Sequence, residues 1–110
     1  MTITSDKSQV CVDVVLNCEH ILTECGKKKK LSGQIENLLN ECARICLGTF
    51  YLIKNGSVNA SRMALLCIGI CEECADVCEG FEDSLFQQCA QACRYCSYNM
   101  YEIAIPNLDS

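Results

Sequence analysis

The chain has 110 residues, of which 50% are hydrophobic and 21% are charged, so it can bury a core and is expected to fold as one domain. A formal net charge of -5 argues against nucleic acid as a partner, because phosphates are usually met by a basic surface. The exceptional feature is the presence of 12 cysteines, a content that indicates either a disulfide scaffold or a metal-binding protein.

The first half of the chain is predicted to form two helices. The first covers residues 8–25 and is expected to end at Gly26, before a run of lysines at positions 27–30. The second covers residues 31–54 and is expected to end at Asn55-Gly56, because both residues tolerate the left-handed backbone that often follows a helix.

The second half is predicted to form two more helices. The third covers residues 58–79, with Ser57 as its capping residue. The fourth covers residues 82–104, and Pro106 prevents any further extension. Because all the connections are short, neighbouring helices should run antiparallel. The expected fold is therefore an all-α, antiparallel four-helix bundle that occupies the whole chain, residues 1–110.

The cysteines recur on these helices at the spacing of a buried seam. The third helix carries the pattern C-x3-C-x2-C-x3-C, and the fourth repeats its 4-3 spacing with Met100 at the next position. The first helix spaces its cysteines by seven, and the second has one pair four residues apart. All of them are therefore predicted to line the core of the bundle: Cys11, Cys18, Cys25, Cys42, Cys46, Cys67, Cys71, Cys74, Cys78, Cys89, Cys93 and Cys96.

Three interpretations compete for this row of thiols. A core that only needs small apolar side chains would use far more Leu, Ile and Val. Disulfides within the C-x3-C pairs are excluded, because β-carbons one turn apart are separated by about 5–6 Å and a disulfide needs about 3.8 Å. Disulfides between different helices are not excluded by this spacing. The third interpretation is a soft metal ion that bridges the sulfurs of each pair.

The identity of the metal follows from the ligands. Thiolates alone select Cu(I), Zn(II) or iron–sulfur clusters. Zinc requires four ligands, whereas continuous helices are expected to supply thiols in pairs, an arrangement that suits Cu(I). The loop motif of cluster ferredoxins, C-x2-C-x2-C-x3-C-P, does not occur. We therefore expect multiple Cu(I) ions per chain, with iron–sulfur electron transfer and zinc–thiolate binding as the alternatives.

Four segments also carry a family resemblance: CVDVVLNCEH (11–20), CARIC (42–46), CIGICEECADVCEG (67–80) and CAQACRYC (89–96). They resemble the cysteine-rich four-helix-bundle copper-binding family, the copper storage proteins, over about residues 9–100. The resemblance implies a homotetramer of bundles that sequesters Cu(I) for storage or detoxification, with every cysteine of this chain at a family cysteine position. Members of the family commonly continue the cysteine series at six further positions. This chain has other residues there, which should lower its capacity for copper: Val15, Leu22, Ile35, Ala64, Phe86 and Met100.

The expected location is the cytoplasm. The N-terminus is polar and shows no secretory signal. The longest apolar run, Ala64 to Cys71, is too short to cross a bilayer, so no membrane partner is expected. A reducing cytosol also favours metal binding over disulfides in a cysteine-rich chain.

An antiparallel bundle also predicts how copper enters. Cys11 is expected to stand apart at the end that holds the chain termini, which apolar side chains should close. Copper should enter at the opposite end, near residues 26–30, and move inward by exchange between thiolates. Four cysteines are expected toward that open end: Cys25, Cys74, Cys78 and Cys89.

Other polar and sulfur-containing residues are given simpler roles. His20 lies about 200° around the helix from Cys18 and should point away from the thiols. Met100 could bind Cu(I) through its thioether, although core packing is the simpler role for it. The tyrosines are expected to pack or to contact other subunits. No catalytic constellation is found, so an enzyme is not expected.

Overall fold

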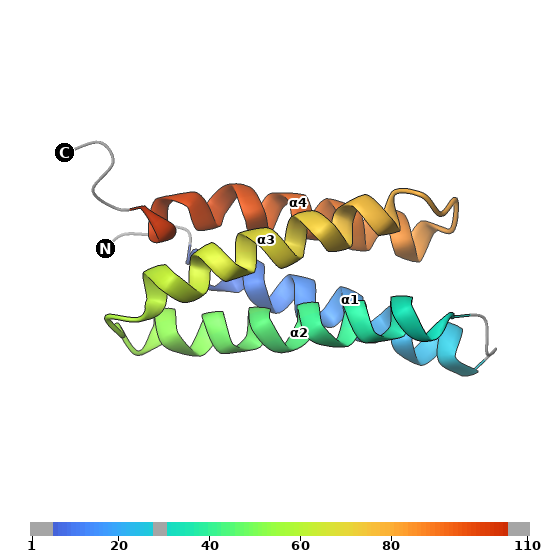
Figure 1. Cartoon of the computed structure of the whole chain (residues 1–110), viewed down its shortest axis with the longest axis horizontal. Coiled ribbons are helices and arrows are strands. Elements are labelled where there is room, and N and C mark those ends of the chain that lie inside the picture. The colour runs from blue at the N-terminus through green and yellow to red at the C-terminus, as the bar shows by residue number, and fades with distance from the viewer. Residues whose placement is uncertain (1–5, 28–30, 106–110) are drawn as a thin grey trace.

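The computed structural model describes residues 6–27 and 31–105, which form four long helices lying side by side (Figure 1). They are α1 (Gln9–Lys27), α2 (Gly33–Lys54), α3 (Ala60–Cys78) and α4 (Ser84–Ala104). Each helix packs against the next one in the chain, and α4 closes the bundle against α1. In this part of the chain no strand occurs, and consecutive helices run in opposite directions. The predicted all-α, antiparallel four-helix bundle is confirmed.

The two ends of the bundle are built from different parts of the chain. The terminal end holds the start of α1, the end of α4 and the connection from α2 to α3 (Figure 1). The opposite end, here called the loop end, holds the end of α1, the start of α2 and the connection from α3 to α4. The lysines at 28–30 and Pro106, to which the sequence assigned helix-ending roles, lie outside the described residues.

Capping side chains set the starts of α2 and α4. Ser32 precedes α2, and its Oγ accepts a hydrogen bond from the backbone N–H of Ile35 at 3.3 Å. Asp83 precedes α4, and its carboxylate accepts from the backbone N–H of Leu85 at 2.8 Å. Each cap satisfies a backbone donor that has no partner within the helix, so both helices begin two residues later than the sequence predicted.

Two residues that the sequence predicted to bound a helix do not have that role. Ser57 does not cap α3; Asn59 takes the capping position, and the Ser57 Oγ accepts from the Asn59 N–H at 3.0 Å in the preceding turn. Gly26 does not end α1, which continues to Lys27. Gly56, in contrast, has a φ of 64° just after α2, the left-handed conformation that glycine adopts at little cost.

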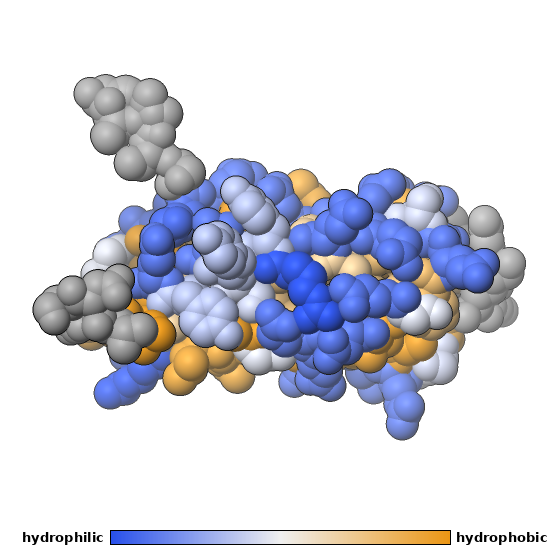
Figure 2. Space-filling model, turned by 90° about the horizontal axis from the view of Figure 1, so that it is seen from above, coloured by the Kyte–Doolittle hydropathy of each residue, from blue (hydrophilic) through white to orange (hydrophobic). Residues whose placement is uncertain are grey.

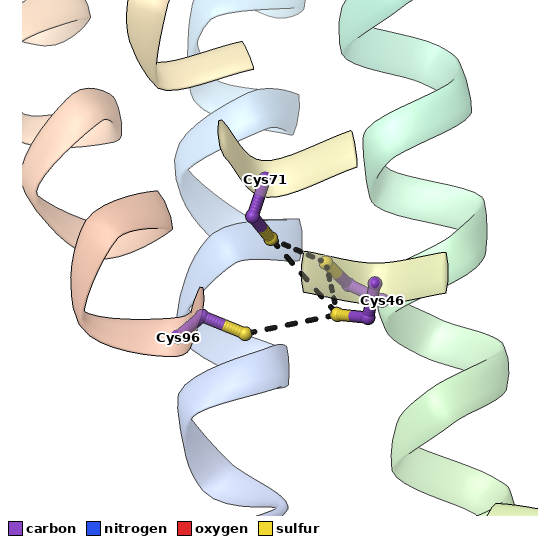
Figure 3. A group of neighbouring side chains, drawn as sticks. Cys46, Cys71 and Cys96 are labelled. Atoms are coloured by element: carbon purple, nitrogen blue, oxygen red, sulfur yellow. Dashed lines mark hydrogen bonds between the residues drawn. The ribbon is translucent and has the colours of Figure 1, made fainter. Parts of the chain in front are cut away.

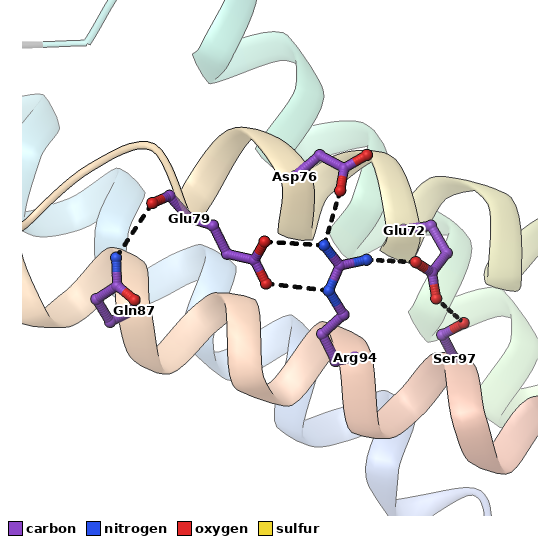
Figure 4. Close-up of polar contacts among 6 residues, drawn as sticks. All are labelled: Glu72, Asp76, Glu79, Gln87, Arg94 and Ser97. Atoms are coloured by element: carbon purple, nitrogen blue, oxygen red, sulfur yellow. Dashed lines mark hydrogen bonds and ion pairs between the residues drawn. The ribbon is translucent and has the colours of Figure 1, made fainter.

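Arg94 of α4 joins its helix to three carboxylates of α3 (Figure 4). Its guanidinium contacts Glu72, and also Asp76 and Glu79 at 2.7 and 2.9 Å. The Glu72 carboxylate accepts a further bond from Ser97 Oγ at 2.6 Å. The hydrogen bond from Arg94 holds the pKa of Glu79 below its usual value. Since water screens these exposed groups, the network mainly fixes how α3 and α4 lie against each other.

The surface is mostly hydrophilic, with apolar side chains between the polar ones, as Figure 2 shows for one face. The tyrosines are exposed by more than half, so they do not pack in the core of this chain: Tyr51, Tyr95, Tyr98 and Tyr101. Among the described helices, none is long and apolar enough to cross a membrane.

Gly69→Ala should stabilise the bundle. Gly69 is exposed within α3, and a β-carbon there would meet no atom within 4 Å. Alanine loses less backbone entropy on folding, so the free energy of unfolding of the reduced, metal-free protein should rise by up to about 1 kcal/mol in urea titrations. Gly48→Ala is the control, because its β-carbon would come within 2.8 Å of Met63 Cε. An equal or larger gain in the control would contradict this close contact.

Candidate metal centre

The core of the bundle is lined with reduced thiols. Eleven cysteines have at most 1% of their surface exposed, and Cys25 is the half-buried exception. All 12 are free. The sulfur contacts are 3.5 to 4.0 Å long, far from the about 2.05 Å of a disulfide bond. The structure therefore places the cysteine stripe inside the bundle and shows none of the disulfides between helices that the sequence left open.

The largest cluster, here the central group, contains four thiols from three helices: Cys46 of α2, Cys67 and Cys71 of α3, and Cys96 of α4 (Figure 3). Cys46 Sγ lies 3.6 and 3.5 Å from the sulfurs of Cys67 and Cys71. Cys67 Sγ is also 3.8 Å from Cys96 Sγ. The expectation that these helices supply thiols only in pairs is wrong, because facing helices complete a set of four.

Two further groups continue the row toward the loop end. One contains three thiols within 4.8 Å of one another: Cys18 of α1, Cys74 of α3 and Cys89 of α4. The other contains three at the same limit: Cys42 of α2, Cys71 of α3 and Cys93 of α4. Cys71 belongs to this group and to the central group, so the sites share a ligand. Cys78 Sγ lies 4.0 Å from Cys74 Sγ and extends the row further.

These separations suit metal ions held between sulfurs. A metal–thiolate bond of about 2.3 Å puts two sulfurs on one ion about 3.8 Å apart in a tetrahedron and about 4.6 Å apart in a line. The observed contacts of 3.5 to 4.0 Å lie at the short end of that range, and the groups extend to 4.8 Å. Small side-chain movements are enough to seat an ion in each group.

The thiols also influence one another's protonation. In each group, neighbouring thiols donate hydrogen bonds that stabilise at least one thiolate, and they lower its pKa. Cys11 has the largest such effect on the pKa of Cys67, and Cys18 has the largest on those of Cys42 and Cys74. Hydrogen bonds with neighbouring thiols, together with burial, raise the pKa of Cys93. A metal ion that binds several of these sulfurs must therefore displace protons.

Cys11 lies closer to the other sulfurs than the sequence suggested. Its Sγ is 3.9 Å from Cys96 Sγ and 3.9 Å from Met100 Sδ. The expectation that Cys11 stands apart is wrong, because α1 packs directly against α4 and brings the two helices' sulfurs together. Met100 is fully buried. His20 is exposed on α1, as its angle from Cys18 predicts.

At the loop end, Cys25 faces an opening. It lines a cavity of about 220 Å³ together with Leu31, Phe81, Asp83 and Phe86. The rings of Phe81 and Phe86 stack with their centroids 4.2 Å apart. Cys25 belongs to none of the three groups, and it is the cysteine that lines this cavity.

Comparisons with known proteins point to one family. A family model described as copper storage protein (Csp) matches residues 3–104. The uncharacterised cysteine-rich protein YhjQ of Bacillus subtilis (strain 168) is 33% identical over 92 residues, which are 81% of this chain and 84% of that protein. The solved structure of a Cu(I)-bound copper storage protein, BsCsp3, superposes with a TM-score of 0.80 at 28% identity. It covers 89% of this chain and 94% of the BsCsp3 chain.

The exposure of the thiols predicts their reactivity. In reduced, metal-free protein, one thiol per chain should react quickly with an aromatic disulfide reagent, because only Cys25 is partly exposed. Cys25→Ser should remove this fast phase, and unfolded wild type should react at all 12 positions. Several fast thiols in the folded Cys25→Ser variant would show that the row is open elsewhere.

Proposed function

The chain belongs to the copper storage protein family, and from this premise we propose that it holds several Cu(I) ions on its core thiolates for storage or detoxification. The observation that carries the proposal is the presence of three thiol groups in the core, two of which share Cys71. Soft thiolates in a buried site select Cu(I), which is stable with only two or three thiolate ligands.

The shared thiol favours a cluster over isolated ions. A Cu(I) ion on two thiolates carries a net negative charge, which is costly to bury. When a thiolate bridges two ions, fewer thiolates are needed per ion and the net charge falls. Cys71 has the position of such a bridge, because it lies within 4.8 Å of the other thiols in both of its groups.

Neither alternative from the sequence is favoured. The central group has the four ligands that a tetrahedral zinc site needs. The other two groups have three thiols each, and one of them shares Cys71 with the central group, an arrangement that suits several ions of low coordination number. The structural match is to a protein with bound Cu(I), and the family is that of copper storage, not of iron–sulfur electron transfer.

Copper is proposed to enter at the loop end. Cys25 supports this route, because it is half-buried and lines the cavity there. Cys78 and Cys74 follow as the next sulfurs inward on α3. At the terminal end, Ala64 and Met100 are fully buried and close the row. Ions would move by exchanging one thiolate for the next, so no bare ion crosses the apolar core.

The cytoplasm and a homotetramer are the proposed location and assembly. Twelve free thiols are chemically suited to a reducing compartment. The exposed side chains of Tyr95, Tyr98 and Leu65 offer apolar surface for contacts between copies of the chain. The proposed role is storage of copper rather than catalysis, with copper ions as the cargo.

Anaerobic titration of the reduced protein with Cu(I), in competition with a chelator, should leave at least two colourless Cu(I) ions per chain in native mass spectra. Cys46→Ser/Cys67→Ser should lower this number, because both central thiols are lost, whereas Cys25→Ser should change it by at most one. Fewer than two retained ions in the wild type would overturn the storage function. A brown protein as isolated would favour the iron–sulfur alternative.

Copper binding should weaken as the pH falls. Thiolates are the ligands, and each of the three groups contains a thiol whose pKa is raised by neighbouring thiols and burial, so an ion that binds the group releases at least one proton. Lowering the pH by one unit should then weaken the apparent affinity about tenfold for each proton released. The measurement is the same competition, with the chelator's own affinity corrected for pH. An unchanged affinity would contradict thiolate ligation.

A further inference from the structure

Two sulfurs at the terminal end lie outside the three groups. Cys11 Sγ of α1 lies 3.9 Å from Met100 Sδ of α4. Cys11 Sγ is also 3.9 Å from Cys96 Sγ, which belongs to the central group. All three side chains have 0% exposure. The row of sulfur atoms therefore continues past the central group and ends on a thioether.

The position of Met100 on its helix directs it to the same axis as the thiols. It follows Cys96 by four residues and continues the 4-3 series of Cys89, Cys93 and Cys96. A buried methionine often only fills space, and leucine would do this equally well. Met100 differs from such a residue because its Sδ directly contacts a thiol of another helix.

The charge of the site favours a thioether at this end. Val14 and Ala64 are fully buried apolar side chains on the halves of α1 and α3 that lie toward the terminal end. A Cu(I) ion on two thiolates would bring a net negative charge into these surroundings, which is costly. One thiolate and one neutral thioether give a net charge of zero, and both are soft donors that suit Cu(I).

We propose that Cys11 and Met100 bind a Cu(I) ion between them, beside Cys96 of the central group. This inference rests on the proposed function, since it adds a thiolate–thioether site to a copper-loaded core. Cys96 connects the added site to the rest of the row, because its sulfur lies 3.8 Å from Cys67 Sγ and 3.9 Å from Cys11 Sγ.

The test uses the three methionines of the chain. Protein labelled with ¹³C at the methionine methyl groups is loaded with Cu(I), which is diamagnetic, and the methyl signals are compared before and after loading. The Met100 signal should shift, because its Sδ gains a bond to the metal. The Met63 signal is the control, since Met63 is only half-buried on α3 and its methyl group lies beside Gly48 of α2. Met100→Leu and Met63→Leu assign the two signals.

The same variants are then loaded in competition with the chelator. Met100→Leu keeps the apolar volume and should retain about one Cu(I) ion fewer than the wild type, whereas Met63→Leu should retain the wild-type number. Circular dichroism checks that both variants remain helical.

Two outcomes would overturn the site: an unmoved Met100 signal in loaded protein, or a wild-type copper number in Met100→Leu. If the wild type itself retains fewer than two ions, the proposed function fails together with the site. A wild type that loads fully while Met100 stays unaffected overturns only the thioether site.

Discussion

The geometry of the α-helix keeps the sulfurs of this bundle close together and unbonded. Cys67 and Cys71 lie one turn apart with their sulfurs 3.9 Å from each other, and Cys74 and Cys78 repeat the arrangement at 4.0 Å. A disulfide within either pair would require the helix to unwind. The backbone thus protects each pair from internal oxidation and leaves a gap of the size that a soft metal ion bridges.

Because the cysteine side chain is small, a core lined with thiols needs larger apolar side chains to fill the rest of its volume. Seven of the cysteines lie on α3 and α4, whereas α1 and α2 supply large buried side chains such as Ile21 and Leu39. The thiol-rich pair is also held from outside by Arg94 and the carboxylates of α3. Apolar packing therefore supports one side of the bundle, and bound metal would add stability on the other, since a ligand that binds only the folded state stabilises it.

The sequence predicted the fold and the inward face of each helix, because hydrophobic and cysteine periodicity reports how a residue is rotated about its own helix axis. It did not predict the four-thiol central group or the contact of Cys11 with Cys96. Those contacts depend on how far one helix is shifted along its neighbour. That shift is set by capping and connection geometry, as at Ser32 and Asp83, and spacing within one helix carries no signal for it.

Because Cys71 belongs to two of the groups, copper binding in one of them changes copper binding in the other. Once one ion has removed the proton from this sulfur, the adjoining group meets a ligand that is already ionised and already oriented. The second ion therefore binds with higher affinity than it would alone. By thermodynamic reciprocity, each ion raises the affinity for the other by the same factor. Chains with this shared ligand should therefore carry either very few copper ions or many, and intermediate copper numbers should be rare.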